Sequence, residues 1–453
     1  MSLSKGSVPG SSRRDFLRAS SMIVAGGAVA GGLTSGLSVA RAAHAFGNET
    51  IKIGLIGCGG RGIGAAGDAL RTSGPVKLVA VADAFEDSVS KAVRGLSSSF
   101  KDRVDVPQER QFSGFDAYQK VLATDCDLVI LATPPGFRPT HFEAAVKAGK
   151  HVFMEKPVAT DARGVRTVIA AAAEAKTKGL SVAVGLQRRH EIAYRETIEK
   201  LQNGIIGDIV TARVYWNGDR PWVRPRQKDQ TELEYQVRNW YHFNWLSGDN
   251  ITEQHIHNLD VINWLFNTAP AEANGMGGRE VLRQKDHGEI FDHHFVEYTY
   301  RIDGREVKMF SQCRHQPGAW NIVDEYVQGT KGWAHVSGGR IFDASGKVIF
   351  HSNGKRGGHQ EEHHHHFADL RKGTIYAEGE YGAMSSMTSI LGRMATASGK
   401  VIQMKDALDR GITLAKPENF HQMSDEAPVK PDSDGYYAIS VPGQTKVLED
   451  KKA

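Results

Sequence analysis

At 453 residues the chain is long enough for two domains, each with an apolar core. The first 45 residues hold five of the 56 basic residues and one of the 52 acidic ones, so the rest of the chain is neutral and gives no argument for a nucleic-acid partner. The three cysteines, Cys58, Cys126 and Cys313, show no CxxC spacing, which excludes a zinc knuckle and a disulfide framework.

The first 45 residues have the pattern of an export signal. Arg13 and Arg14 stand in "SRRDFLRAS", and a weakly apolar Gly/Ala run with A-x-A cleavage sites follows. The S-R-R-x-F-L-R pattern is typical of twin-arginine signals; the alternative is a basic, irregular N-terminus. The run is too polar for a spanning helix. We therefore expect a mature protein without a membrane segment, periplasmic or secreted through the twin-arginine export machinery.

A cofactor-binding domain is expected next, because that route is understood to pass folded proteins that have often bound a cofactor already. The run "IKIGLIGCGGRGIGAAGDAL" goes from a short apolar strand, through a glycine-rich turn, into a helical pattern. Such a turn lets the backbone approach a pyrophosphate, and the helix N-terminus supplies partial positive charge. The candidate cofactor-binding residues here are Gly57, Gly59, Gly60, Arg61 and Gly62.

A second predicted strand, "VKLVAVAD", ends in Asp83. A carboxylate at this point accepts hydrogen bonds from the adenosine ribose hydroxyls and repels a 2′-phosphate. Ala84 and Phe85 follow, rather than an arginine, so the sequence favours NAD over NADP. The alternative is that Asp83 is a simple strand-end cap.

Two further strands complete the pattern of the first half. Residues 128–132 are typical of a buried parallel strand, residues 141–148 of a short helix, and "HVFMEKP" of another strand. The alternation predicts a doubly wound parallel sheet, with ligand-binding loops at the carboxyl ends of its strands. The candidate cofactor-binding residues at these ends are Thr133, Pro134, His141, Glu155 and Lys156.

These motifs, in this order, make the chain resemble the glucose–fructose oxidoreductase/inositol dehydrogenase family, often called Gfo/Idh/MocA. The resemblance implies a Rossmann domain followed by an α+β domain with a large open, mostly antiparallel sheet, whose outer face commonly forms the oligomer interface. It also implies that Lys156 of the "EKP" motif reaches the nicotinamide and the substrate hydroxyl. A lysine there is well placed to stabilise a developing alkoxide; the alternative is a solvated surface lysine.

The second half shows the alternation of antiparallel strands in "GDIVTARVYWNG", "HHFVEYTYRIDGREVKMFSQC" and "NIVDEYVQGTKGWAHV". We expect the chain to divide into a signal peptide (1–45), a Rossmann domain (50–187), a substrate-binding and oligomerisation domain (188–400) and a C-terminal extension (401–453). The resemblance implies a homodimer or homotetramer.

One strong helix interrupts these strands, in "NITEQHIHNLDVINW" (250–264). Asn250 or Thr252 is expected to cap it, and helical spacing brings Glu253, His257 and Asp260 close to one face. The resemblance implies an acidic residue and a histidine as the catalytic pair, which here are Glu253 and His257; the family's usual acid is aspartate. The alternatives are a Glu253/His257 metal site that needs outside ligands, and a structural histidine.

His257 suits the role of catalytic base because its unperturbed pKa lies near neutrality. It is expected to take the alcohol proton while hydride leaves the same carbon for NAD. Glu253 is expected to orient the imidazole or to hold a neighbouring hydroxyl. We assign no residue to a metal.

Aromatic and basic residues near these motifs are candidates for binding a sugar ring, whose C–H face stacks and whose hydroxyls form hydrogen bonds. The alternative for most of the aromatic residues is a place in the core or an interface. The candidate substrate residues, besides His257, are Arg188, Arg189, Trp222, Arg238 and Trp240.

Three further segments carry smaller predictions. "EEHHHHFADL" (361–370) is expected to start a polar helix near the cleft, with a metal site at residues 363–366 as the alternative. His293 and His294 are expected at a strand entrance with at most one side chain inward. The last residues are expected to form an extended surface tail.

The lead functional prediction is an exported NAD-dependent oxidoreductase that acts on a secondary alcohol of a sugar, glycoside or cyclitol. Free NAD is scarce outside the cytoplasm, so we expect a tightly held cofactor. The second hypothesis is a glycoside hydrolase that uses NAD in transient ring oxidation, and the third is a non-catalytic sugar-binding protein with the same fold.

Overall fold

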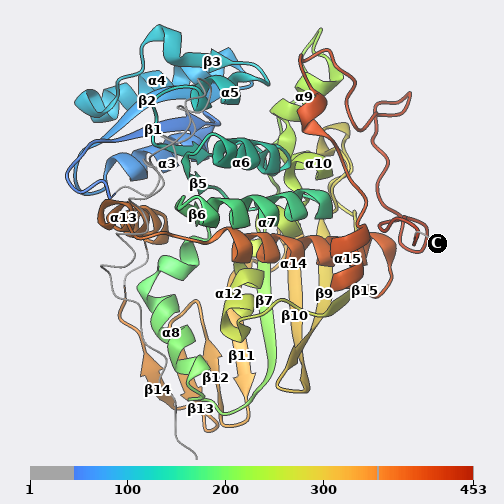
Figure 1. The fold of residues 1–453 in the computed structure, drawn as a ribbon. Helices are drawn as coiled ribbons and strands as arrows, with labels where there is room; N and C mark the ends of the chain where they lie inside the picture. The colour runs from blue at the N-terminus through green and yellow to red at the C-terminus, as the bar shows by residue number, and fades with distance from the viewer. Residues whose placement is uncertain (1–44, 355–356, 452–453) are drawn as a thin grey trace, which may run out of the picture.

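A computed structural model describes residues 45–354 and 357–451 of the chain. The strands of the first half form a six-stranded parallel sheet in the order β3-β2-β1-β4-β5-β6 (Figure 1). This is the order of the doubly wound dinucleotide-binding sheet, which confirms the predicted fold class. The strands are β1 (Ile51–Ile56), β2 (Val76–Asp83), β3 (Gln111–Ser113), β4 (Leu128–Leu131), β5 (His151–Met154) and β6 (Val182–Val184).

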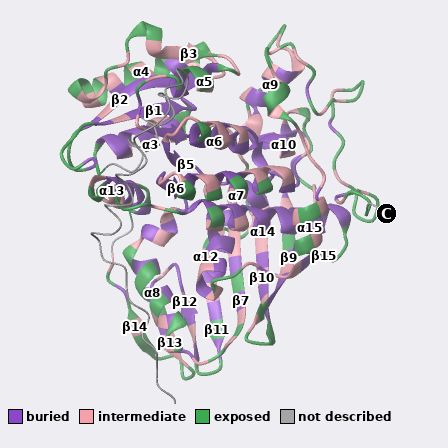
Figure 2. Ribbon diagram, in the orientation of Figure 1, coloured by how far each residue is buried: buried purple, intermediate pink, exposed green. Residues whose placement is uncertain are grey.

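Helices cover both faces of this sheet, so β4, β5 and β6 are buried throughout, whereas the edge strand β3 is partly exposed (Figure 2). One face packs on α3 (Gly60–Leu70), α4 (Glu86–Phe100) and α13 (Gly358–Lys372). The other packs on α5 (Ala117–Leu122), α6 (Arg138–Lys147) and α7 (Ala162–Thr177). Although α13 falls in the range 188–400, its Phe367 and Leu370 join the core of the first sheet.

The second half contains a nine-stranded sheet in the order β14-β13-β12-β11-β7-β10-β9-β8-β15. Its pairs are antiparallel except for β10 with β7, so the predicted open, mostly antiparallel sheet is confirmed. The strands are β7 (Ile209–Gly218), β8 (Glu272–Gly278), β9 (His293–Ile302), β10 (Arg305–His315), β11 (Ile322–Gly329), β12 (Gly332–His335), β13 (Arg340–Asp343), β14 (Val348–His351) and β15 (Ile402–Gln403).

One face of the second sheet is covered by α12 (Ile256–Phe266) and α14 (Gly379–Ser398), with α8 (Ile192–Gln202) packed against α12. Apolar side chains on this inner face, such as Val214 and Met309, are fully buried. The remaining helices of the described chain are α9 (Glu232–Arg238), α10 (Asn244–Ser247), α11 (Asn250–Glu253) and α15 (Met404–Arg410).

The helix expected over residues 250–264 is broken into α11 and α12. The break lies at Gln254 and His255, where the His255 N–H donates to the Asn250 carbonyl and the His257 N–H to the Gln254 carbonyl. The N-cap of α11 is Asp249, whose carboxylate accepts from the Asn250 N–H, so the prediction that Asn250 or Thr252 caps the helix was wrong.

Two smaller predictions concern the start of β9 and the C-terminal tail. His294 is buried and the side chain of His293 is 42% exposed, as expected at a strand entrance. The tail after α15 is irregular, but it is not simply a surface strand, because Ala427, Tyr437 and Val447 are buried. Within residues 45–354 and 357–451, no helix has both the length and the apolar character that a bilayer crossing requires.

The glycines of the β1–α3 turn allow a direct test of the packing. A Cβ at Gly62 would lie 1.8 Å from the Gly57 carbonyl oxygen, whereas a Cβ at Gly60 would meet nothing within 4 Å. We expect Gly62→Ala to lower the free energy of unfolding by about 1–3 kcal/mol through overpacking, and Gly60→Ala to change it by less than about 0.5 kcal/mol. Urea unfolding followed by circular dichroism measures both; equal losses would contradict the packing role of Gly62.

Candidate active site

The turn between β1 and α3 has the shape that a dinucleotide needs. Gly57 has φ +101°, and a Cβ there would lie 2.5 Å from the Thr133 nitrogen, so the β1 and β4 loops touch at this point. Gly59 and Gly60 have open space where a Cβ would stand. Gly59 is the N-cap of α3 and has no side chain to accept from the first-turn N–H groups, which suits those groups to an anionic ligand.

Asp83 ends β2 beside this turn, and its carboxylate is fixed by backbone donors. Oδ2 accepts from the Cys58 N–H at 2.7 Å and Oδ1 from the Phe85 N–H at 3.0 Å. Burial raises the pKa of Asp83, and the two backbone hydrogen bonds oppose that rise. The carboxylate is thus held at the edge of the cleft, where it can accept further hydrogen bonds from hydroxyl groups.

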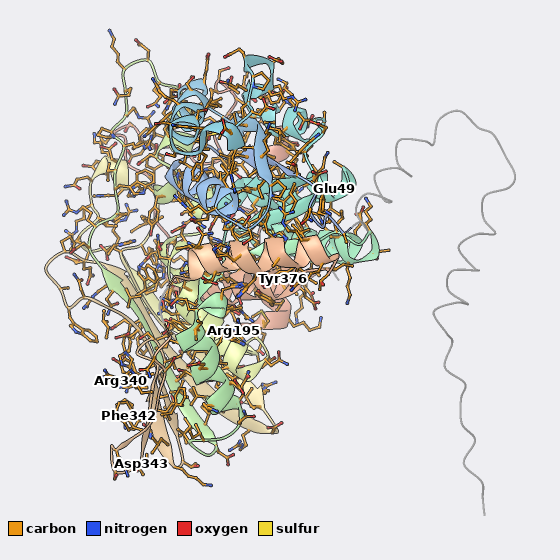
Figure 3. All side chains as sticks on the ribbon, turned by 90° about the vertical axis from the view of Figure 1, so that its left-hand side faces the viewer. Glu49, Arg195, Arg340, Phe342, Asp343 and Tyr376 are labelled. Atoms are coloured by element: carbon orange, nitrogen blue, oxygen red, sulfur yellow. The ribbon has the colours of Figure 1, made fainter. Side chains whose placement is uncertain are left out.

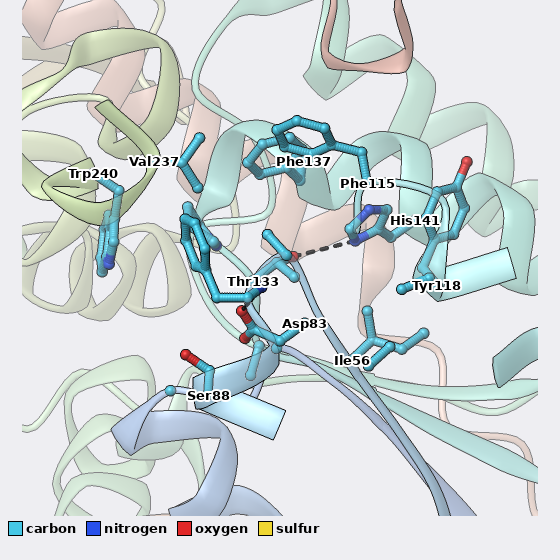
Figure 4. A pocket seen from close by; sticks show the side chains of 18 of the residues that line it. Ile56, Asp83, Ser88, Phe115, Tyr118, Thr133, Phe137, His141, Val237 and Trp240 are labelled. Atoms are coloured by element: carbon cyan, nitrogen blue, oxygen red, sulfur yellow. Dashed lines mark hydrogen bonds between the residues drawn. The ribbon is translucent and has the colours of Figure 1, made fainter. Parts of the chain in front are cut away.

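Most of the predicted cofactor residues line one cavity of about 190 Å³ (Figure 4). Thr133 Oγ1 lies 3.3 Å from His141 Nδ1, and the His141 ring stacks on Tyr118 with centroids 4.3 Å apart. Burial lowers the pKa of His141 to about 3, so its imidazole is neutral at physiological pH. The predicted residues that line the cavity are Gly57, Gly59, Gly60, Arg61, Asp83, Thr133, Pro134 and His141.

Arg61 and Glu155, both expected to bind the cofactor, bind each other. Arg61 Nε donates to Glu155 Oε1 at 2.5 Å, and its Nη2 donates to Glu362 Oε1 of α13 at 3.2 Å. Asp68 lies 3.6 Å from Arg61 Nη1. The "EEHHHH" segment therefore forms a helix near the cleft, as predicted, and it reaches the fingerprint turn through Glu362.

Lys156 and Glu253 form a buried ion pair between the two halves of the chain. Lys156 Nζ lies 3.0 Å from Glu253 Oε1 and also donates to the Glu253 backbone carbonyl. Both side chains are 10% exposed. Burial raises the pKa of Glu253, and the Lys156 ammonium opposes that rise. The break after α11 directs Glu253 to Lys156, and no hydrogen bond joins it to His257 in the described chain, so Glu253 does not orient the imidazole as expected.

His257 lies in the first turn of α12 and is buried against the inner face of the second sheet. Its ring stacks on Trp216 with centroids 5.9 Å apart. Burial, together with the charges of Lys156 and Arg188, holds the pKa of His257 well below its usual range. The expectation of a near-neutral pKa is therefore corrected: His257 is a neutral imidazole with its Nδ1 unpartnered within residues 45–354 and 357–451.

Sequence reasoning missed Arg138, a fully buried arginine in the first turn of α6. Its guanidinium donates to the Thr133 carbonyl and to the Pro157 carbonyl. It thereby holds the loop after β4 and the turn that carries Lys156. Burial lowers its pKa to about 10, and Glu155 and Glu253 oppose that fall. No sequence signal distinguishes this arginine from a surface residue, because its role depends on two loops that meet only in the fold.

Arg188 and Arg189, expected to bind substrate, are committed to carboxylates. Arg188 is ion-paired with the buried Glu325 of β11. Arg189 forms a bidentate pair with Asp260 at 2.8 and 2.9 Å, stacks over Tyr381 and lines a second pocket, which shares no lining residue with the first. Both arginines therefore neutralise buried carboxylates, and this explains their positions in the fold.

The other predicted substrate residues lie on the cofactor side. Arg238 and Trp240 line the same cavity as Asp83, and Figure 4 shows Trp240 across the cavity from His141. Trp222 is 43% exposed and packs edge-on against Trp240. In the described parts of the chain, no group of three or more histidine, cysteine or acidic side chains has the geometry to hold a metal ion.

Comparisons with known proteins agree with this geometry. Residues 51–184 match the family described as "Oxidoreductase family, NAD-binding Rossmann fold" (GFO_IDH_MocA). The chain is 25% identical over 283 residues to inositol 2-dehydrogenase of Rhizobium meliloti (62% of this chain, 74% of that protein). It is 28% identical over 258 residues to scyllo-inositol 2-dehydrogenase (NADP(+)) of Bacillus subtilis (56% of this chain, 60% of that protein).

The fold is shared with a solved structure of scyllo-inositol dehydrogenase from Lactobacillus casei with bound NAD(H) and scyllo-inositol. The TM-score is 0.58 at 20% identity, over 79% of this chain and all of that one. Residues 51–184, which hold the glycine turn, Asp83 and most of the residues that line the cavity, therefore match the NAD-binding Rossmann domain of the Gfo/Idh/MocA oxidoreductase family.

Proposed function

We propose that the protein is a NAD-dependent oxidoreductase that transfers hydride between the nicotinamide and a secondary alcohol of a cyclitol or sugar. The observation that carries this proposal is the buried Lys156–Glu253 pair, which stands at the end of β5 next to the NAD-binding cleft with His257 nearby. Relatives whose names specify inositol 2-dehydrogenase activity support the substrate class.

NAD is favoured over NADP because the fixed Asp83 carboxylate stands where a 2′-phosphate would add negative charge. When bound, the oxidised nicotinamide supplies the hydride acceptor, so that the alcohol carbon becomes a carbonyl carbon.

The side chains of the protein accept the hydroxyl proton and stabilise the charge on the alcohol oxygen. The neutral His257 accepts the hydroxyl proton and becomes an imidazolium, while the Lys156 ammonium donates a hydrogen bond to the same oxygen and stabilises its negative charge. Glu253 holds Lys156 in place and keeps the pair neutral overall. In the reverse direction His257 returns the proton to the carbonyl oxygen as hydride reaches the carbon.

Substitution of the two groups tests the proposal. We expect Lys156→Met and His257→Asn each to lower kcat by about 10²–10⁴-fold, with binding of NADH retained. The assay follows the absorbance of reduced nicotinamide with myo-inositol, scyllo-inositol and glucose as substrates. Lys147→Ala, which removes an exposed lysine paired with Glu143, serves as the control. Wild-type turnover in both site variants would contradict the assignment.

We also propose that the protein works outside the cytoplasm. The signal pattern in residues 1–45 supports this, and residues 1–44 lie outside the part of the chain that the structure describes. Replacing Arg13 and Arg14 by lysine should retain the protein in the cytoplasm, as measured by cell fractionation. Unchanged export of that double variant would contradict a twin-arginine route.

We further propose that the outer face of the second sheet joins two or four copies of the chain. Aromatic residues gather there: Phe295 stacks on Phe310, and Trp333 stacks on Phe342 at 3.9 Å (Figure 3 shows Phe342 on the side away from the helices). Met276 is 73% and Phe295 40% exposed. An apolar face of this kind marks an interaction surface.

Light scattering coupled to size-exclusion chromatography tests the assembly. Phe295→Asp places a charge on the outer face and should give a monomer, because a buried unpaired carboxylate would oppose association. Ile375→Asp, at an exposed site away from that face, should leave the mass unchanged. A monomeric wild-type protein would contradict the proposal.

A further inference from the structure

One wall of the NAD-binding cavity comes from the second half of the chain. The segment that contains α9, here called the α9 wall (residues 224–240), contributes Arg224, Val237, Arg238 and Trp240 to the cavity lining. Figure 4 shows Val237 and Trp240 on the side opposite His141 and Tyr118. The cleft is thus enclosed by elements from both halves.

Arg238 fastens this wall to the adenosine end of the Rossmann domain. Its guanidinium lies 3.8 Å from the Phe85 ring centroid, and its Nη2 lies 3.2 Å from Asp87 Oδ1. Glu234 on the previous turn holds the Arg238 Nε at 3.0 Å. Arg238 therefore spans the gap between α9 and the loop that follows Asp83.

The C-terminal segment braces the wall from behind. Gln236 Nε2 donates to the Val429 carbonyl at 2.6 Å, and the Tyr437 hydroxyl donates to Glu232 Oε1 at 2.6 Å. Phe420 packs between Phe115 of the Rossmann domain and Trp245, at 5.8 and 5.6 Å. Figure 1 shows part of the chain that follows α15 (dark red) running alongside α9.

The charge of the wall suits a dinucleotide. Arg224 and Arg238 line the same cavity as the N-terminus of α3. Arg224 lies over Trp222 at 5.5 Å rather than on a carboxylate. Asp87 and Glu234 balance the charge of Arg238, so Arg224 and the N-terminus of α3 supply the positive charge that this part of the cavity offers to an anionic ligand.

We propose that the α9 wall, braced by residues 414–437, is part of the cofactor site and retains NAD(H) as a resident group that does not exchange between turnovers. This inference rests on the proposed function and extends it from binding to retention. Leaving the cavity requires the bound dinucleotide to displace Arg238 or the wall itself, and the brace opposes that movement.

The test measures the dissociation rate of NADH from the purified full-length protein by the loss of its fluorescence after a large excess of NAD⁺ is added. We expect Arg238→Ala to raise the dissociation rate constant about tenfold, because lost contacts in a complex act mainly on dissociation. Tyr437→Phe removes only the hydroxyl that links the brace to α9, and it should raise the rate in the same direction. Arg283→Ala, which removes an exposed arginine paired with Glu280, is the matched control and should equal the wild type.

The outcomes separate the two proposals. If the wild type binds NADH and both wall variants release it at the wild-type rate, the retention role is overturned while the proposed function stands. If the wild type binds no dinucleotide, the proposed function itself fails. Faster release from Arg238→Ala and Tyr437→Phe, with Arg283→Ala unchanged, supports the wall and its brace.

Discussion

The arrangement of the site depends on one buried ion pair, between Lys156 and Glu253. The first residue follows a strand of the parallel sheet and the second ends a short helix above the antiparallel sheet, so the pair fixes the two halves of the chain relative to each other. An ammonium or a carboxylate buried alone would cost several kcal/mol. Each therefore requires the other, and the pair places a positive charge where an alcohol oxygen would lose its proton.

The first sheet was largely predictable because its signals are local. An apolar run, a glycine turn and a helical pattern lie together in sequence, and the glycines at positions 57 and 62 are demanded by contacts of 2.5 Å or less that any side chain would make. The alternation of apolar and polar residues predicted that the second sheet is mostly antiparallel. The position of α13 was not predictable, because nothing in its polar, histidine-rich sequence says which of two sheets it covers.

The sequence predicted which residues form the site, but it predicted less well which residues each of them contacts. Lys156, Glu253 and His257 do come together, yet the break between α11 and α12 turns Glu253 toward the lysine, and burial takes the pKa of His257 away from neutrality. Arg188 and Arg189 follow the last strand of the first sheet in sequence, but they pair with distant carboxylates, those of Glu325 and Asp260. Helical periodicity cannot reveal such a break, and spacing along the chain cannot reveal a partner in another element.

We expect a dinucleotide to lie between the glycine turn and Lys156, and a crystal structure of the protein with NAD⁺ and a cyclitol would test this placement directly. The ribose hydroxyls should lie on Asp83, the diphosphate at the start of α3, and the nicotinamide beside Lys156 with the alcohol carbon about 3–3.5 Å from its reactive carbon. A nicotinamide bound away from Lys156 and His257, or a cleft closed to the dinucleotide, would contradict this placement.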